Sequence, residues 1–289
     1  MGTRLIAALL NPAGLLIPAG LLVLAAIPLE TSSDPVPHVA WGRHAIWDDG
    51  LAEVAVYRSQ RVVYGKPRSF ETTLITVKED FNAAYHAKAE PPYRGKALLP
   101  ILKLNVVAEI QTEHYPYRYL TSLFVDRNDV GRVIKMTVGS QEWCGNTFKE
   151  VRAWGGKHEL AYHSYWDGEG DGVYAMDWTA DTMLEDQLAL SLRALPFADG
   201  YERQADIIPT QVNNRAFRPV ARPGRIHVVG RELIEAGGES SDAWRVEVSF
   251  GETRQTYWFL ETHPNIMLRF DSSDGRHLQL EHWSRRTYW

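Results

Sequence analysis

The sequence predicts a mainly β protein, built as a curled antiparallel sheet or an incompletely closed β-barrel with one packed helix. Three observations predict this class. Short segments of alternating apolar and polar residues recur along the chain, and Gly, Asp, Asn and Pro separate them. Ten Trp and thirteen Tyr favour strands and bury large areas. After the N-terminal region, only one segment has clear helical spacing.

The N-terminal region is strongly apolar. A run without charged residues follows Arg4 and extends to Ile27, and it is about long enough to span a bilayer. Pro12 and Pro18 interrupt it as a helix, and small residues near its end offer a cleavage point. We predict that residues 1–27 form a hydrophobic leader helix, either a cleaved signal peptide or a retained membrane anchor. A buried N-terminal helix is the third alternative.

The rest of the chain divides into a short linker and a β-rich region. Residues 28–40 are rich in Pro and Ser and predict a flexible linker. Residues 41–289 are enough for one large β domain or two small ones. Their two halves, about 41–178 and 179–289, would be two sheets of one barrel or two adjacent modules.

Strand patterns follow one another through both halves. In the first half they cover residues 52–63, 69–77, 101–110, 132–138, 151–154, 158–166 and 173–178. In the second half they cover residues 225–234, 244–250, 254–260, 266–270 and 277–283. Gly- and Asp-rich segments at 167–172 and 272–275 predict hairpin turns between the strands that flank them.

One helix is predicted at about residues 182–195. Thr182 and Glu185 have the spacing of a capping box. An apolar stripe at helical spacing follows, made of Leu184, Leu188, Leu192 and Leu195. Pro196 ends the pattern. We expect the leucine stripe to pack on the sheet.

Composition excludes several classes of function. The formal net charge is −5, and basic and acidic residues are interspersed, so no nucleic-acid partner is predicted. The basic residues Arg58, Arg61, Lys66 and Arg68 are interpreted as a solvated face rather than an anion site, because strand alternation spreads them. Cys144 is the only cysteine, which excludes an internal disulfide and a lipid anchor after the leader. No GxGxxG, GxxxxGK[ST], GxSxG or CxxC motif occurs, and no cofactor is predicted.

The order of motifs in the second half resembles a known group. The motifs are the helical segment 186–195 with Pro196-Phe197, Gly200-Tyr201, residues 229–232, 243–250 and 257–260, and residues 263–270 before Gly275. They resemble exported bacterial β-rich proteins of unknown function that are similar in style to lipoprotein carriers. The resemblance implies a curled antiparallel sheet, an unclosed barrel wrapped around a helix. It covers roughly 100 residues.

The first half resembles a second group. Its motifs are residues 64–68, 77–82, 102–105 and 140–145. They resemble exported proteins that often carry the label "septum formation inhibitor Maf". True Maf proteins are cytoplasmic nucleotide pyrophosphatases of α/β fold, and this chain has neither alternating β-α units nor their Ser-rich, Arg-containing loop. Pyrophosphatase activity is therefore not implied. The resemblance implies a protein of the periplasm or cell envelope.

Five residues are candidates for a ligand pocket: Glu142, Trp143, Cys144, His163 and Trp258. Strand alternation would place Glu142 and Cys144 on one face and Trp143 on the other. The favoured interpretation is a buried, apolar Cys144 beside a core Trp. A ligand pocket and a catalytic thiol are the alternatives, and the latter needs a histidine from a neighbouring strand.

Metal binding is not expected from the histidines, because His158 and His163 are five residues apart and not four. Asp167, Glu169 and Asp171 resemble the opening of a calcium loop, but an EF-hand needs Glu at its twelfth position, where Trp178 stands. A weak, partial cation site is the alternative to a plain hairpin turn.

Three functions fit these patterns. The first is an exported binding or carrier module for a lipid or another apolar, envelope-derived ligand, with membrane contact through residues 5–27. The second is a structural or protein-interaction component of the envelope without a small ligand. The third is a hydrolase that uses Cys144 or a His–carboxylate pair. We expect the inner face of the sheet to discriminate between them: it is either an empty apolar cleft or filled by its own side chains.

Overall fold

The computed structural model describes residues 37–289. The predicted leader at residues 1–27 and most of the predicted linker at 28–40 lie outside the described residues. Helix α1 (Pro37–Gly42) begins within the last part of that linker, and the short 3-10 helix η1 (Ala45–Asp48) follows it. Among residues 37–289, no helix has the length and apolar character needed to cross a membrane.

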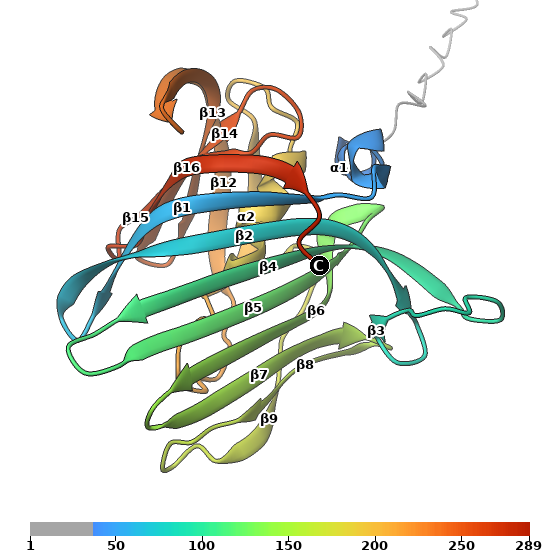
Figure 1. The fold of residues 1–289 in the computed structure, drawn as a ribbon, viewed down its shortest axis with the longest axis vertical. Helices are drawn as coiled ribbons and strands as arrows, with labels where there is room; N and C mark the ends of the chain where they lie inside the picture. The colour runs from blue at the N-terminus through green and yellow to red at the C-terminus, as the bar shows by residue number, and fades with distance from the viewer. Residues whose placement is uncertain (1–36) are drawn as a thin grey trace, which may run out of the picture. The chain divides into compact units, whose positions relative to one another are not determined.

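The prediction of a mainly β fold with an unclosed sheet is confirmed, because one 16-stranded sheet contains nearly all of the regular structure (Figure 1). The first half contributes β1 (Ala52–Val63), β2 (Lys66–Asn82), β3 (Ala87–Lys88), β4 (Leu98–Gln111), β5 (Pro116–Asp126), β6 (Asp129–Glu142), β7 (Gly145–Trp154), β8 (Lys157–His163) and β9 (Asp171–Ala175). The second half contributes β10 (Thr182–Leu184), β11 (Glu202–Ile208), β12 (Arg222–Ala236), β13 (Glu239–Phe250), β14 (Thr253–Leu260), β15 (Met267–Ser272) and β16 (His277–Arg286).

The two halves join within this single sheet. The strand order is β10-β11-β12-β13-β14-β15-β16-β1-β2-β4-β5-β6-β7-β8-β9, with β3 on β2. The last strand, β16, pairs antiparallel with the first, β1, from Ala52 opposite Arg286 to Gln60 opposite His277. All pairs are antiparallel except β10 with β11. The edge strands β9 and β10 are consecutive in the chain but are not paired with each other, so the sheet stays open.

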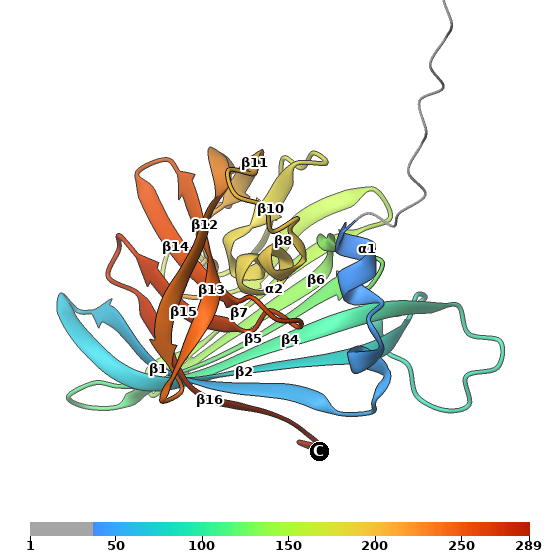
Figure 2. The same ribbon diagram turned by 90° about the horizontal axis from the view of Figure 1, so that it is seen from above.

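The sheet curls around its own helical segment (Figure 2). Register shifts place extra residues in β6, β12, β15 and β16, and an extra residue in one strand increases its local bend and twist. In β12 the shift falls between Val228 and Gly230, whose φ of 150° favours glycine. The inner face carries the main core, which unites strands of both halves with helix α2 (Leu188–Ser191).

The predicted helix at 182–195 is present only in part. Residues 182–184 are strand β10, and the helical segment consists of η2 (Glu185–Gln187), α2 and η3 (Leu192–Ala194). The capping-box prediction is wrong. At the start of the helical segment the backbone N–H of Leu184 donates to the side chain of Gln187, so the pair involved is not Thr182 and Glu185. The Thr182 hydroxyl instead accepts from the backbone N–H of Thr179. Pairing with β11 recruits Thr182 into the sheet, a tertiary interaction that overrides the local signal.

The predicted leucine stripe is confirmed as a packing surface. Leu184, Leu188, Leu192 and Leu195 are all buried in the main core. The opposite side of the segment is buried too, since Gln187, Leu190 and Ser191 are almost inaccessible. The segment is therefore a plug surrounded by protein rather than a helix with one solvated face.

Candidate functional site

Within residues 37–289, many side chains on the inner face of the sheet are buried in the main core, and a cleft of about 250 Å³ lies beside them. The cleft lies where β1, β2, β4 and β5 approach β15, β16 and the loop after β11. Its apolar walls include Phe70, Val106, Ile110, Tyr119, Val212 and Phe270. A site of this volume is slightly smaller than the roughly 300–1,000 Å³ that drug-sized ligands occupy. The cleft thus suits a small ligand or part of a chain-like one.

Four charged side chains also line the cleft, and three of them are engaged by protein groups. Arg276 contacts Asp274 at 2.5 Å and Glu185, just beyond the cleft, at 2.6 Å. The carboxylate of Asp186 accepts from the hydroxyl of Thr210 and the backbone N–H of Gln211. Burial raises the pKa of Asp186, and the neighbouring Glu185 raises it further.

The fourth charged side chain, Arg61, has a different environment. Its guanidinium donates to the carbonyl oxygen of Val212 at 3.3 Å and lies 5.6 Å from the ring centroid of Tyr119. Across residues 37–289, no carboxylate lies within 4.0 Å of this guanidinium. Burial lowers the pKa of Arg61 below its ordinary value, as expected for a cation that has lost water without gaining a counter-ion.

The cleft is bordered by a strap, which we define as residues 209–216 of the loop between β11 and β12. The strap crosses the inner face and is held by polar side chains of the sheet and plug. Asn214 donates to Glu142, and its carbonyl accepts from Thr147 and Trp166. Other contacts join Arg215 and Ala216 to Glu169, and Thr210 to Glu185. These contacts fix the strap over the polar end of the inner face.

Lys149 is the most buried of these anchors. Its ammonium donates to the backbone carbonyl and side-chain oxygen of Asn213, both at 3.2 Å, and to the carbonyl of Arg215 at 2.7 Å. Burial lowers the pKa of Lys149 from its ordinary 10.5 to about 8. The Lys149 ammonium therefore lies in a cage of oxygen atoms and holds the strap in place. These hydrogen bonds compensate only partly for the hydration that the ammonium loses.

We expect Lys149→Met to release the strap. The variant leaves the carbonyls of Asn213 and Arg215 without their donor, which costs about 1–3 kcal/mol locally. Hydrogen exchange of the amides in residues 209–216 should accelerate, whereas exchange in β4 and β5 should not. The matched control is Lys157→Met, on an exposed lysine. Equal strap protection in both variants would contradict the role of Lys149.

The same residue predicts a dependence on pH. The folded-state pKa of Lys149 is lower than the unfolded value, so the unfolded chain binds more protons between about pH 8 and 10.5. The loss of folding stability caused by burying the charged Lys149 is fully present below pH 8 and disappears as the pH rises to 10.5. Lys149→Met should remove this contribution to the free energy of unfolding, on the order of 3 kcal/mol over that window.

The structure does not bring the five predicted pocket residues together. Glu142 ends β6 and anchors the strap, while Trp143 and Cys144 form the turn to β7. Trp143 is 76% exposed and Cys144 is also exposed. The favoured interpretation of Cys144 as a buried residue beside a core Trp is therefore wrong, because the turn, not a strand, holds both. The Cys144 sulfur lies 3.1 Å from the hydroxyl of Tyr115.

His163 and Trp258 lie away from these residues. His163 is exposed and pairs with Asp171 at 3.1 Å across the β8–β9 hairpin. Trp258, on β14, donates to Glu232 and lies 4.9 Å below the guanidinium of Arg269. For the described residues, the only side chain that contacts Cys144 through a hydrogen bond is Tyr115, and no histidine does. A thiol without a base lacks the activation that nucleophilic catalysis needs.

The acidic turn of residues 167–172 forms the predicted hairpin between β8 and β9. Glu169 points to the protein, where it accepts from Ser164 and from the backbone N–H of Ala216. Asp171 pairs with His163, and Asp167 is exposed. Within residues 37–289, no group of three or more His, Cys, Asp or Glu side chains is arranged to hold a metal ion.

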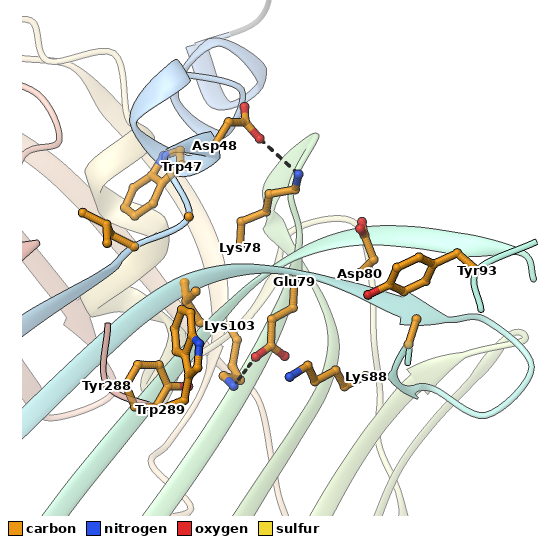
Figure 3. A pocket seen from close by; sticks show the side chains of 14 residues that line it. Trp47, Asp48, Lys78, Glu79, Asp80, Lys88, Tyr93, Lys103, Tyr288 and Trp289 are labelled. Atoms are coloured by element: carbon orange, nitrogen blue, oxygen red, sulfur yellow. Dashed lines mark hydrogen bonds and ion pairs between the residues drawn. The ribbon is translucent and has the colours of Figure 1, made fainter. Parts of the chain in front are cut away.

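Within residues 37–289, cavities of about 400, 420 and 820 Å³ are larger than the cleft, and two of them offer fewer unpaired groups. One of about 420 Å³ lies beneath η1 and the C-terminal residues Tyr288 and Trp289 (Figure 3). Four of its charged side chains form two ion pairs, Lys103 with Glu79 at 2.5 Å and Lys78 with Asp48 at 3.1 Å. The other, of about 820 Å³, lies near α1 and the β7–β8 turn, and its aromatic rings form two His–Trp stacks, His86–Trp154 and His158–Trp178.

Arg61 does not belong to the solvated face that was predicted for it. Arg58 does point to solvent, but Arg61 follows the buried Tyr57 and Ser59 at alternate positions and so faces inward. That alternation was a usable signal.

Comparison of the chain with protein-family models, curated proteins and solved structures finds no match in any of the three.

Proposed function

We propose that this protein is an exported binding or carrier module of the cell envelope, which holds a small apolar ligand in the cleft beside the strap. The observation that supports this function is a cleft with apolar walls on the inner face of an otherwise filled sheet. Because most of that face is occupied by the plug, the ligand is small or inserts only one end. Export remains the prediction made from residues 1–27.

The two alternatives receive less support. A hydrolase would need a nucleophile in contact with a base, and within residues 37–289 Cys144 has Tyr115 as its partner. The His–carboxylate pairs His163–Asp171 and His277–Asp271 are at the surface, and no hydroxyl or thiol side chain of the described residues is hydrogen-bonded to either histidine. A structural role without a ligand does not account for the apolar walls of the cleft beside an arginine that pairs with no carboxylate within residues 37–289.

The test fills the cleft. Ala108 lies on the inner face between Thr72 and Tyr119 and lines the cleft, so Ala108→Phe would occupy it. Ala161→Phe, on the outer face of β8, is the matched control. The full chain is purified from envelope fractions under mild conditions and analysed by native mass spectrometry and solvent extraction.

We expect the wild type and Ala161→Phe to carry a bound small molecule that Ala108→Phe lacks, while all three retain their thermal transitions. A wild type without ligand, combined with no thermal shift from medium-chain amphiphiles, would overturn the proposal. The row of exposed apolar residues on the outer face, Val107, Leu120 and Phe148, would then be the first surface to crosslink for the interaction alternative.

A further inference from the structure

The cleft contains one cation that protein groups leave largely unsatisfied. A guanidinium carries five N–H donors in a fixed planar fork, and the contact of Arg61 within residues 37–289 is one hydrogen bond to Val212. The other arginine of the cleft, Arg276, has carboxylates on two sides. An arginine in a partly dry site without a counter-ion is suited to bind an anion, because charge-assisted, bidentate hydrogen bonds are the strong ones.

The acidic groups of the cleft, in contrast to Arg61, already have hydrogen-bond or ion-pair partners within the protein. Both oxygens of Asp186 already accept hydrogen bonds, from Thr210 and Gln211. Asp274 pairs with Arg276, which it shares with Glu185. Among the charged groups of the cleft, the unsatisfied hydrogen-bonding capacity is therefore donor capacity, and it belongs to Arg61. A ligand that brings acceptors with negative charge gains most there.

The apolar wall begins beside this cation. Tyr119 lies against the guanidinium, and Phe70, Val106 and Ile110 line the same cleft. A ligand that pairs with Arg61 and also packs on the apolar wall has a compact anionic head and a short hydrocarbon body. The volume of about 250 Å³ limits the enclosed part of that body to a short chain.

We propose that the cleft binds an anionic amphiphile, of the medium-chain carboxylate class, with its head group paired to Arg61 and its chain against Phe70, Val106 and Ile110. This inference rests on the proposed function and names the chemistry of its ligand. Specificity then arises from the head group, because a neutral analogue leaves the guanidinium without a counter-ion.

The test compares head groups on the wild-type full chain. Decanoate, methyl decanoate and decyltrimethylammonium are titrated below their micellar concentrations, and Kd is measured by calorimetry or by chemical shifts. We expect decanoate to bind at least about tenfold more tightly than the two other probes. Equal binding of decanoate and its methyl ester would overturn the anion inference and leave the proposed function standing. Absence of binding by all three probes would count against both.

Variants locate the head group. Arg61→Gln should weaken decanoate at least about tenfold and leave methyl decanoate unchanged, and Arg61→Lys should recover part of the loss. Arg58→Gln, three residues away on the outer face and largely exposed, is the matched control and should match the wild type. If Arg61→Gln retains wild-type affinity for decanoate, the head group lies elsewhere and the assignment to Arg61 fails. Circular dichroism confirms that each variant is folded.

Discussion

Arg193→Met should lower the free energy of unfolding by about 3–5 kcal/mol, the largest loss we expect from a single substitution. The guanidinium of Arg193 forms a bidentate ion pair with Glu53 on β1, at 2.7 and 2.8 Å, and both side chains are only 4% exposed. It also donates to the carbonyl of Pro264. The substitution leaves the buried carboxylate of Glu53 and the carbonyl of Pro264 without the donor that Arg193 provides.

The position of this pair explains why the loss should be global. Arg193 lies in the plug, Glu53 in the first strand, and Pro264 in the connection from β14 to β15. The rings of Trp41 and Trp47 lie 5.0 and 5.9 Å from the guanidinium. One side chain therefore ties the plug to both halves of the sheet and to the segment before β1.

Denaturant titration with a double substitution separates charge from packing. Glu53→Leu with Arg193→Met removes both charges, and we expect it to be more stable than either single variant, since an apolar pair needs no counter-ion. Arg118→Met is the matched control, because its pair with Glu109 is 58% and 55% exposed and should contribute less than about 1 kcal/mol. A double variant as unstable as the sum of the singles would show that packing dominates.

Leu188→Ala should lower the free energy of unfolding by about 2–5 kcal/mol. Leu188 begins α2 and is completely buried in the core that unites both halves of the sheet. Its removal leaves a cavity between elements that the surrounding strands hold apart, so the site cannot collapse fully, and the cost includes a cavity contribution.

The matched control is Leu233→Ala, the same chemical change on β12 at a side chain that is 65% exposed. It should alter stability by no more than about 0.5 kcal/mol. Thermal and denaturant unfolding of both variants check the prediction. A loss below about 1 kcal/mol for Leu188→Ala would mean that the plug is loosely packed and that the inner face has more free volume than the cleft.

The strands were the most predictable part of the fold. The pattern at residues 52–63 coincides with β1, and both predicted hairpin turns lie between paired strands. Strand β5 was missed, although Tyr117, Tyr119, Leu123 and Val125 alternate cleanly on its buried face. Pro116 stands at its first position and weakens the local strand pattern.

In the helix predicted at residues 182–195, tertiary contacts override the local sequence signals. The leucine spacing correctly identified a buried segment, but pairing with β11 converts its first residues into β10. The resulting plug is short and irregular because polar groups of the sheet bond to it. Ser191, for example, donates to the backbone carbonyl of Val130.

The candidate site depended almost entirely on contacts between distant parts of the chain. Arg61 meets Val212 across 151 residues, and Lys149 meets Arg215 across 66. Neither contact has a local sequence signal, because strand alternation decides which face a residue occupies but not what covers that face. The exposure of Cys144 was mispredicted for a related reason: a two-residue turn between β6 and β7 was interpreted as continuous strand.

By itself, the sequence determined that this protein is mainly β, where most of its strands and turns lie, and that its leucine-rich segment is buried. These properties follow from periodicity and turn chemistry, which act over a few residues. Only the tertiary structure decided that both halves share one open sheet, that the plug fills most of its inner face, and that Arg61 lies in the remaining cleft without a counter-ion. Those outcomes depend on strand register and on the path of the strap, which are set by packing across the whole chain.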